Sequence, residues 1–306
     1  MEGRIEERMM RVNRNLKKEI PWVLFLVPAL LVYSIVVIIP TISTLAYSFT
    51  DYNGFSSAFH LVGGKNYLQV FQNKDAVNSI TNSLIYGVTV PVLVTVFAIP
   101  LALVLNSNLK SKNVLRAVFF FPSVISTLFL GYIWKFILSS SSTGLINSLR
   151  INAGKEALLL LADQKMAMPL LILITVWSSV GWHACIYIAN LQTISPDYYE
   201  AATLDGASKW QQFKNITFPM LTPAMSSSIL LLLTGNLKAY DLPYALTSGG
   251  PGTATTMITQ TIIEEGVTSN RVGYASAMSF LFLIVIAVLT VSVNTFIAKR
   301  ERKLYE

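Results

Sequence analysis

The chain has 306 residues, 53% of them hydrophobic and only 13% charged, with a formal net charge of +7. Because soluble globular domains carry about 25% charged residues, this composition excludes a soluble enzyme, and the apolar content excludes intrinsic disorder. Cys185, the one cysteine of the sequence, has no partner for an intramolecular disulfide, and the positive charge indicates basic cytoplasmic loops of a membrane protein rather than a nucleic-acid partner.

Six long apolar runs predict an all-α membrane protein. They cover residues 22–48, 81–105, 114–138, 167–191, 223–245 and 273–298. Each run exceeds the ~20 residues that cross the hydrocarbon core as a helix. The first run is too long for the apolar part of a cleaved signal peptide, so we expect it to be an uncleaved anchor. Prolines within the runs, such as Pro91, Pro100 and Pro122, predict kinked helices.

Lysine and arginine residues predict the orientation of these spans. Six spans place both termini on one side, and the segments on that side carry fifteen Lys and Arg residues against seven on the other. Since basic loops stay in the cytoplasm, we expect cytoplasmic termini and a multi-pass location in the cell membrane, with the lipid bilayer as a partner. The expected parts are a basic N-terminal segment (1–21), a six-helix transmembrane domain (22–298) with a cytoplasmic loop (192–222), and a basic tail (299–306).

The cytoplasmic loop after the fourth run is predicted to form two short helices. Ser195 followed by Pro196 is typical of a helix start, with a side-chain cap before a proline in the first turn. Gly206 is expected to end this helix in the left-handed conformation. Ser208 then caps a second helix, which we expect Pro219 to stop.

The first of these helices exposes small residues and one acid, namely Ala201, Ala202 and Glu200. Small side chains let a helix sit close in a groove of a partner protein, where one carboxylate fixes its orientation. An amphipathic helix lying on the membrane surface fits the same pattern. The pattern alone leaves both explanations open.

The loop resembles the "EAA" loop of binding-protein-dependent ABC importer permeases. The matching positions are Glu200-Ala201-Ala202, Asp205-Gly206-Ala207, Ile216 and Pro219. Two further segments are similar to carbohydrate permeases of the maltose and glycerol-phosphate type: Tyr240-Asp241 with Leu246-Thr247-Ser248-Gly249-Gly250-Pro251, and Gly63-Gly64-Lys65-Asn66-Tyr67. The resemblance covers essentially the whole chain, although the extra N-terminal spans and large external domain of the maltose-type subunit are missing.

The resemblance implies a type I ABC importer permease fold and a transport subunit without catalysis of its own. In that family the loop is a coupling helix that docks into a cytoplasmic ATPase. The implied ATPase-coupling residues are Glu200, Ala201, Ala202, Leu204, Asp205 and Gly206. The implied partners are a second homologous permease subunit, two cytoplasmic ABC ATPase subunits and an extracytoplasmic solute-binding protein. No P-loop motif occurs in the sequence, so ATP and Mg are expected on the ATPase, and this chain is expected to bind no cofactor and no metal.

Two sets of residues within the spans are candidates for the substrate pathway. They are Thr175, Ser178, Ser179 and Trp182 in the fourth run, and Gly235, Asn236, Ala239 and Tyr240 in the fifth, each set at helical spacing. On pattern alone helix packing is favoured, because small and hydroxyl residues also line interhelical contacts. The resemblance instead implies sugar contacts at these positions, although the small Gly235 and Ala239 depart from the family pattern.

Charges within spans, such as Lys238 and Asp241, are candidates for function, and His183 for a proton relay, but simpler explanations are favoured for all three. We expect Lys238 and Asp241 to form a local ion pair near the external interface, and His183 to be a packed, hydrogen-bonded histidine. The alternative function is a secondary transporter or channel for a small polar solute. It predicts inverted repeats and buried ionisable residues along the path, of which the sequence has no clear repeat and few such charges. A membrane enzyme would need a catalytic constellation, and none occurs.

Overall fold

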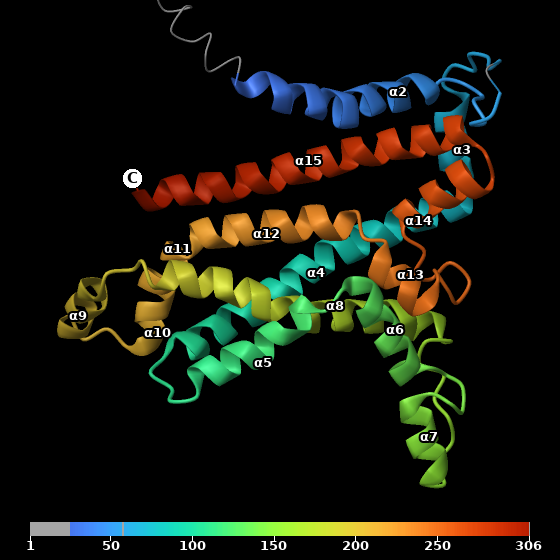
Figure 1. Ribbon diagram of the computed structural model, residues 1–306. Helices are drawn as coiled ribbons and strands as arrows, with labels where there is room; N and C mark the ends of the chain where they lie inside the picture. The colour runs from blue at the N-terminus through green and yellow to red at the C-terminus, as the bar shows by residue number, and fades with distance from the viewer. Residues whose placement is uncertain (1–24, 57, 306) are drawn as a thin grey trace, which may run out of the picture.

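The computed structural model describes residues 25–56 and 58–305 and is built almost entirely of helices (Figure 1). The elements in chain order are η1 (Ser34–Ile38), α2 (Ile39–Tyr47), α3 (Lys65–Gln72), α4 (Lys74–Asn106), α5 (Lys112–Val124), α6 (Thr127–Leu138), α7 (Leu145–Asn152), α8 (Gln164–Leu191), α9 (Pro196–Leu204), α10 (Lys209–Gln212), η2 (Phe213–Thr217), α11 (Phe218–Met220), α12 (Thr222–Leu237), α13 (Asp241–Thr247), α14 (Ile258–Ile263), η3 (Glu264–Thr268) and α15 (Val272–Tyr305). The predicted N-terminal basic segment, 1–21, lies outside the described residues, as does the start of the first predicted span.

Four helices of the described chain are each long and apolar enough to cross a membrane. They are Phe25–Tyr47, Lys74–Asn106, Gln164–Leu191 and Val272–Lys299. Two bent pairs, Lys112–Val124 with Thr127–Leu138 and Lys209–Met220 with Thr222–Leu237, raise the number to six if each pair is one span. These segments overlap the six apolar runs in order. Six spans stay a prediction, because a bent pair fits a re-entrant loop as well as a broken span.

Prolines lie inside the helices of both the second and the third predicted spans. α4 continues through Pro91 and Pro100 as a single helix of 33 residues. α5 instead ends two residues after Pro122, and the chain turns by 95° before α6 begins. Proline lacks the N–H of the helix ladder, and its ring crowds the carbonyl four residues earlier. α4 packs against both α8 and α12, and these neighbours support it across its prolines.

The fifth span starts differently from the prediction. We expected Pro219 to stop the second loop helix, but Pro219 lies in the first turn of α11. The break falls at Leu221, where the chain bends by 61° into α12. Pro223 explains this position, since in a continuous helix its ring would crowd the carbonyl of Pro219, whereas a first-turn position needs no N–H.

The fifth span also ends earlier than predicted. α12 stops at Leu237, and the separate helix α13 begins at Asp241. Pro243 is the third residue of α13, and in a continuous helix its ring would crowd the carbonyl of Ala239. The helical spacing predicted for the pathway residues of this span is therefore wrong, because Ala239 and Tyr240 lie beyond the end of α12.

α4, α8 and α12 form the centre of the bundle (Figure 1). Nearly buried side chains from all three helices make up the main apolar core; examples are Tyr86, Val94, Leu171, Tyr187 and Leu232. α15 packs against α12 and, at the edge of the bundle, against α2. The most apolar part of Phe25–Tyr47 has no buried residue, as expected for a helix that faces lipid or another chain.

The two ends of the bundle carry different segments (Figure 1). The C-terminus lies at the same end as α9 and α10, whereas α7 projects from the other end. This arrangement agrees with the predicted placing of the tail and the 192–222 loop on one side of the membrane. The cytoplasmic identity of that side stays a prediction.

Candidate functional site

All eight residues predicted for the substrate pathway line one cavity of about 520 Å³ between α8, α12 and the segment before α13. They are Thr175, Ser178, Ser179, Trp182, Gly235, Asn236, Ala239 and Tyr240. We call this space the central cavity. The error in the predicted end of the fifth helix does not remove Ala239 and Tyr240 from it, because the chain that follows α12 stays beside α8.

Hydrogen bonds within the protein occupy some of these polar groups. The hydroxyl of Thr175 donates to the carbonyl of Leu171 at 2.9 Å and lies 2.7 Å from the hydroxyl of Tyr86. Ser178 donates to the carbonyl of Thr175 at 3.0 Å. In contrast, no hydrogen bond to another described residue is formed by the hydroxyl of Ser179, which therefore remains available to a ligand.

Trp182 and Asn236 place a ring and an amide at the central cavity. The indole of Trp182 is 40% exposed, so a large aromatic surface borders the cavity. The amide nitrogen of Asn236 donates to the carbonyl of Leu232 at 2.8 Å, which orients the side chain on α12 and leaves its oxygen as an acceptor. A hydroxyl, an amide oxygen and an aromatic ring thus meet at one space.

Several residues of the central cavity were not predicted. They are Tyr86, Thr127, His183, Leu231, Leu232, Lys238, Asp241, Leu242 and Pro243. Tyr86 belongs to α4 and Thr127 to α6, and no local sequence signal links either helix to the α8 stripe. Lys238 and Asp241 were noticed as charges, but the expected ion pair between them is wrong. Among the described residues the ion pairs are Asp51–His60 and Glu265–Arg271.

The end of α12 explains why Lys238 and Asp241 do not pair. Residues three apart face each other only on a continuous helix, and the helix ends before Lys238. Both side chains are exposed and line the central cavity instead. The cavity therefore has one cationic and one anionic group beside its neutral polar groups.

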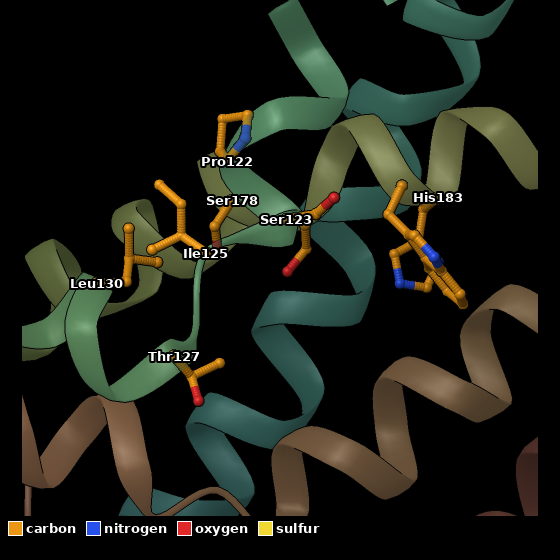
Figure 2. Close-up of a pocket in the computed structure, with 9 residues that line it drawn as sticks. Pro122, Ser123, Ile125, Thr127, Leu130, Ser178 and His183 are labelled. Atoms are coloured by element: carbon orange, nitrogen blue, oxygen red, sulfur yellow. The ribbon is translucent and has the colours of Figure 1, made fainter. Parts of the chain in front are cut away.

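A second cavity of about 230 Å³, the side cavity, opens at the break between α5 and α6 (Figure 2). Its lining residues are Pro122, Ser123, Ile125, Thr127, Leu130, Ser178, Ser179, Trp182 and His183. Figure 2 shows Ile125 and Thr127 at the two ends of the short connection between the helices. Five of these residues also line the central cavity, so the two cavities are adjacent lobes. The break in the third span thus creates space beside the predicted pathway.

His183 is a packed, hydrogen-bonded histidine, as predicted. Its Nδ1 lies 2.7 Å from Oγ of Ser228, and the residue is only 5% exposed. The adjacent Trp182 meets the imidazole edge to face, with ring centroids 4.7 Å apart. The contact with Ser228 joins α8 to α12 next to both cavities.

The loop between α8 and α12 has the predicted local structure. Oγ of Ser195 accepts a hydrogen bond from the backbone N–H of Asp197 at 3.3 Å and caps α9. Gly206 follows α9 with φ of +79°, the left-handed conformation expected there. Ser208 and Gln211 form a capping box that starts α10. Both helix starts and the glycine turn are therefore confirmed.

The six predicted coupling residues lie on or directly after α9. Glu200, Ala201, Leu204, Asp205 and Gly206 are exposed, and Ala202 is half-buried. Leu204 is 89% exposed, so its apolar side chain is open to contact. No cluster of His, Cys, Asp and Glu suited to a metal ion occurs in the part of the chain that the structure describes.

Known proteins resemble this chain in sequence and in fold. The family model "Binding-protein-dependent transport system inner membrane component" matches residues 94–303. A probable starch degradation products transport system permease protein of Thermoanaerobacterium thermosulfurigenes is 32% identical over 96% of this chain and 99% of its own length. A probable ABC transporter permease protein of Bacillus subtilis is 36% identical over 91% of this chain and 95% of its own.

A solved structure shares the fold. It is the crystal structure of a bacterial alginate ABC transporter in complex with an alginate pentasaccharide-bound periplasmic protein. One chain matches with a TM-score of 0.80 and 22% identity, over 94% of this chain and 97% of its own. The helical arrangement described above is thus the fold of an ABC importer permease.

Proposed function

This multi-pass membrane protein belongs to the binding-protein-dependent transport system inner membrane components, and we propose that the substrate which crosses the membrane through its central cavity is a sugar or an oligosaccharide. The observation that carries this proposal is the meeting of all eight predicted pathway residues around one cavity. A related permease is named for starch degradation products, and the structure that shares the fold belongs to a transporter of a polysaccharide.

The chemistry of the cavity suits a carbohydrate. Sugar hydroxyls need hydrogen-bond partners of both kinds, and Ser179, Asn236 and Tyr240 supply a hydroxyl, an amide and a phenol. The indole of Trp182 offers a flat apolar surface for the C–H face of a pyranose ring. Lys238 and Asp241 also line the cavity. The ammonium of Lys238 can donate, and the carboxylate of Asp241 can accept, charge-assisted hydrogen bonds with sugar hydroxyls.

We propose that the energy for transport comes from a separate ATPase that docks on α9. Glu200 supplies the charge that orients the contact, and the exposed Leu204 supplies apolar surface. Ala201, Ala202 and Gly206 allow a close approach because their side chains are small or absent. Two ATPase subunits would carry ATP and Mg, while this chain binds no cofactor.

The complete importer needs further chains. We propose that a second, homologous permease covers the open side of the cavity, and that an extracytoplasmic solute-binding protein delivers the sugar to the end of the bundle that carries α7. The complex would lie in the cell membrane, with both termini of this chain in the cytoplasm. Closure of the ATPase would switch the cavity between inward-facing and outward-facing states by a rigid-body change.

The test is affinity purification of the tagged chain from its native membrane under gentle solubilisation. We expect the wild-type chain to bring down an ATPase, and Glu200→Lys to lose it, because the substitution reverses the charge at the proposed contact. Glu156→Lys, which makes the same charge change at an exposed glutamate after α7, is the matched control and should retain the ATPase. A wild-type chain that recovers no ATPase would contradict the proposed docking of an ATPase on α9.

A further inference from the structure

α9 is tied to the following elements by side-chain hydrogen bonds. Tyr199 and Thr203, four residues apart, share one face of the helix. The hydroxyl of Tyr199 lies 3.0 Å from Oγ1 of Thr217 in η2. Oγ1 of Thr203 accepts a 2.9 Å hydrogen bond from Nε2 of Gln212, the last residue of α10. We call these four side chains the α9 latch.

The polar groups of the latch satisfy one another. Nε2 of Gln212 also donates to the carbonyl of Ala207 at 3.3 Å, and the hydroxyl of Thr203 donates to the carbonyl of Tyr199 at 2.7 Å. Gln212 and Thr217 are each only 5% exposed, whereas Tyr199 is half-buried and Thr203 is exposed. Partial loss of a network whose Gln212 and Thr217 side chains are buried leaves polar groups unsatisfied there, which is costly.

The latch bridges a weak point in the backbone. Between α9 and α10 the chain passes through Gly206, which has φ of +79° and no atom within 4 Å of the position a Cβ would take. Glycine offers little resistance to rotation. The Gly206 hinge is also spanned by a backbone hydrogen bond, from the N–H of Ala207 to the carbonyl of Ala202 at 2.9 Å, and the side-chain bonds add the contacts that hold α9 to the end of α10 and to η2.

After α10, the chain enters the apolar core through residues that are packed against their neighbours. Phe213 of η2 and Phe218 of α11 lie 6.0 Å apart and pack against the main apolar core. Leu221, at the bend into α12, is fully buried. α12 then carries Gly235 and Asn236 to the central cavity. The chain from η2 to the cavity wall thus runs through packed residues.

We propose that Tyr199 and Gln212 are positioning residues for energy coupling. Their hydrogen bonds join α9, α10 and η2 into one rigid body across the Gly206 hinge, so that a displacement of α9 moves the start of α12. The inference rests on the proposed function, since it requires an ATPase that pushes on α9. Tyr199 and Gln212 would contribute to coupling without touching the ATPase themselves.

The experiment follows a reporter cysteine in the assembled complex. Cys185→Ser removes the one native cysteine, and Leu231→Cys places a thiol at an exposed position of the central cavity. The rate of labelling by a water-soluble maleimide is measured in membrane vesicles with and without ATP and vanadate, which trap a closed ATPase. With the latch intact, the nucleotide is expected to change this rate.

Loss of the latch should reduce the nucleotide-dependent change. We compare the faster labelling rate with the slower one, measured with and without nucleotide. We expect Tyr199→Phe or Gln212→Leu to lower this ratio by about two- to tenfold, the equilibrium shift that one hydrogen bond provides. The ATPase should still co-purify, because its contact residues are intact. Thr217→Ser, which keeps the hydroxyl, should behave like the parent, and Thr217→Val should behave like Tyr199→Phe.

The control and the contrary outcomes separate the two proposals. Tyr198→Phe alters the neighbouring, exposed tyrosine, whose hydroxyl bonds to none of the described residues, and should leave the ratio unchanged. If the Tyr199→Phe/Gln212→Leu double variant keeps the parent's ratio of labelling rates, or loses the ATPase, the latch inference alone is overturned. A parent chain that recovers no ATPase overturns the proposed function and the latch with it.

Discussion

Trp182 is the residue whose removal should affect transport most. It borders both cavities and offers the largest aromatic surface to a sugar ring. We expect Trp182→Ala to raise the concentration for half-maximal uptake of labelled maltotriose about tenfold in cells with the complete importer, since loss of such a contact costs about 0.5–1.5 kcal/mol beyond buried area. Asn236→Leu should have a smaller effect in the same direction.

Trp177 provides the matched control. It lies on the same helix, is similarly exposed, and packs edge to face on Trp134 at 5.5 Å rather than lining either cavity. Trp177→Ala should therefore leave the half-maximal concentration near that of the parent. Equal effects of the two tryptophan substitutions, or no effect of Trp182→Ala and Asn236→Leu, would contradict the assignment of the pathway.

The contact between His183 and Ser228 should contribute to stability. Ser228 is fully buried, so Ser228→Ala leaves Nδ1 of His183 buried without its partner. An unsatisfied buried group costs about 1–3 kcal/mol. We expect Ser228→Ala to lower the free energy of unfolding by that amount in mixed micelles, followed by tryptophan fluorescence. Ser227→Ala, at the exposed neighbouring serine, should change it little, and equal values for both variants would refute the role of the contact.

At the scale of elements, the approach of α5 to α8 depends on Gly181. A Cβ at this position would overlap the backbone of Phe119 and Phe120, so the two helices would have to separate. We expect Gly181→Ala to destabilise the protein by about 1–3 kcal/mol, the usual cost of overpacking, and to widen the side cavity. Unfolding in mixed micelles measures the first effect.

Gly235 is a suitable comparison on another helix. No atom lies within 4 Å of the position its Cβ would take. Alanine favours a helix interior over glycine by roughly 0.5–1 kcal/mol, so Gly235→Ala should leave stability unchanged or raise it. If both glycine substitutions lowered stability equally, close packing of α5 on α8 would not be the cause.

For the whole molecule, the predicted orientation is open to a direct test. Figure 1 places α9 and α10 at one end and α7 at the other, and the basic residues predict that the first end is cytoplasmic. In the Cys185→Ser chain, a membrane-impermeant maleimide added to intact cells should label Ser142→Cys, before α7, and not Lys209→Cys, in α10. In permeabilised cells, the maleimide should label both variants. Labelling in the reverse order would overturn the orientation.

Local signals in the sequence were sufficient for much of this structure. Apolar runs long enough to span the membrane overlap all six candidate segments, because the cost of placing residues in lipid depends on composition. The caps at Ser195 and Ser208 and the turn at Gly206 were predictable because each depends on neighbours within a few residues. The eight residues that line the central cavity were named through the family resemblance, not by periodicity alone.

Tertiary structure decided where the helices break and which residues lie opposite the polar residues of α8. Pro91, Pro100 and Pro122 all lie inside helices, and the break in the third span falls after Pro122, at Ile125 and Ser126, where no proline stands. Tyr86, Thr127 and Ser228 come from helices far along the chain, and no periodicity connects them to Thr175, Ser179 or His183. Composition and capping act locally, whereas a cavity and its hydrogen-bond partners exist only after distant helices have packed.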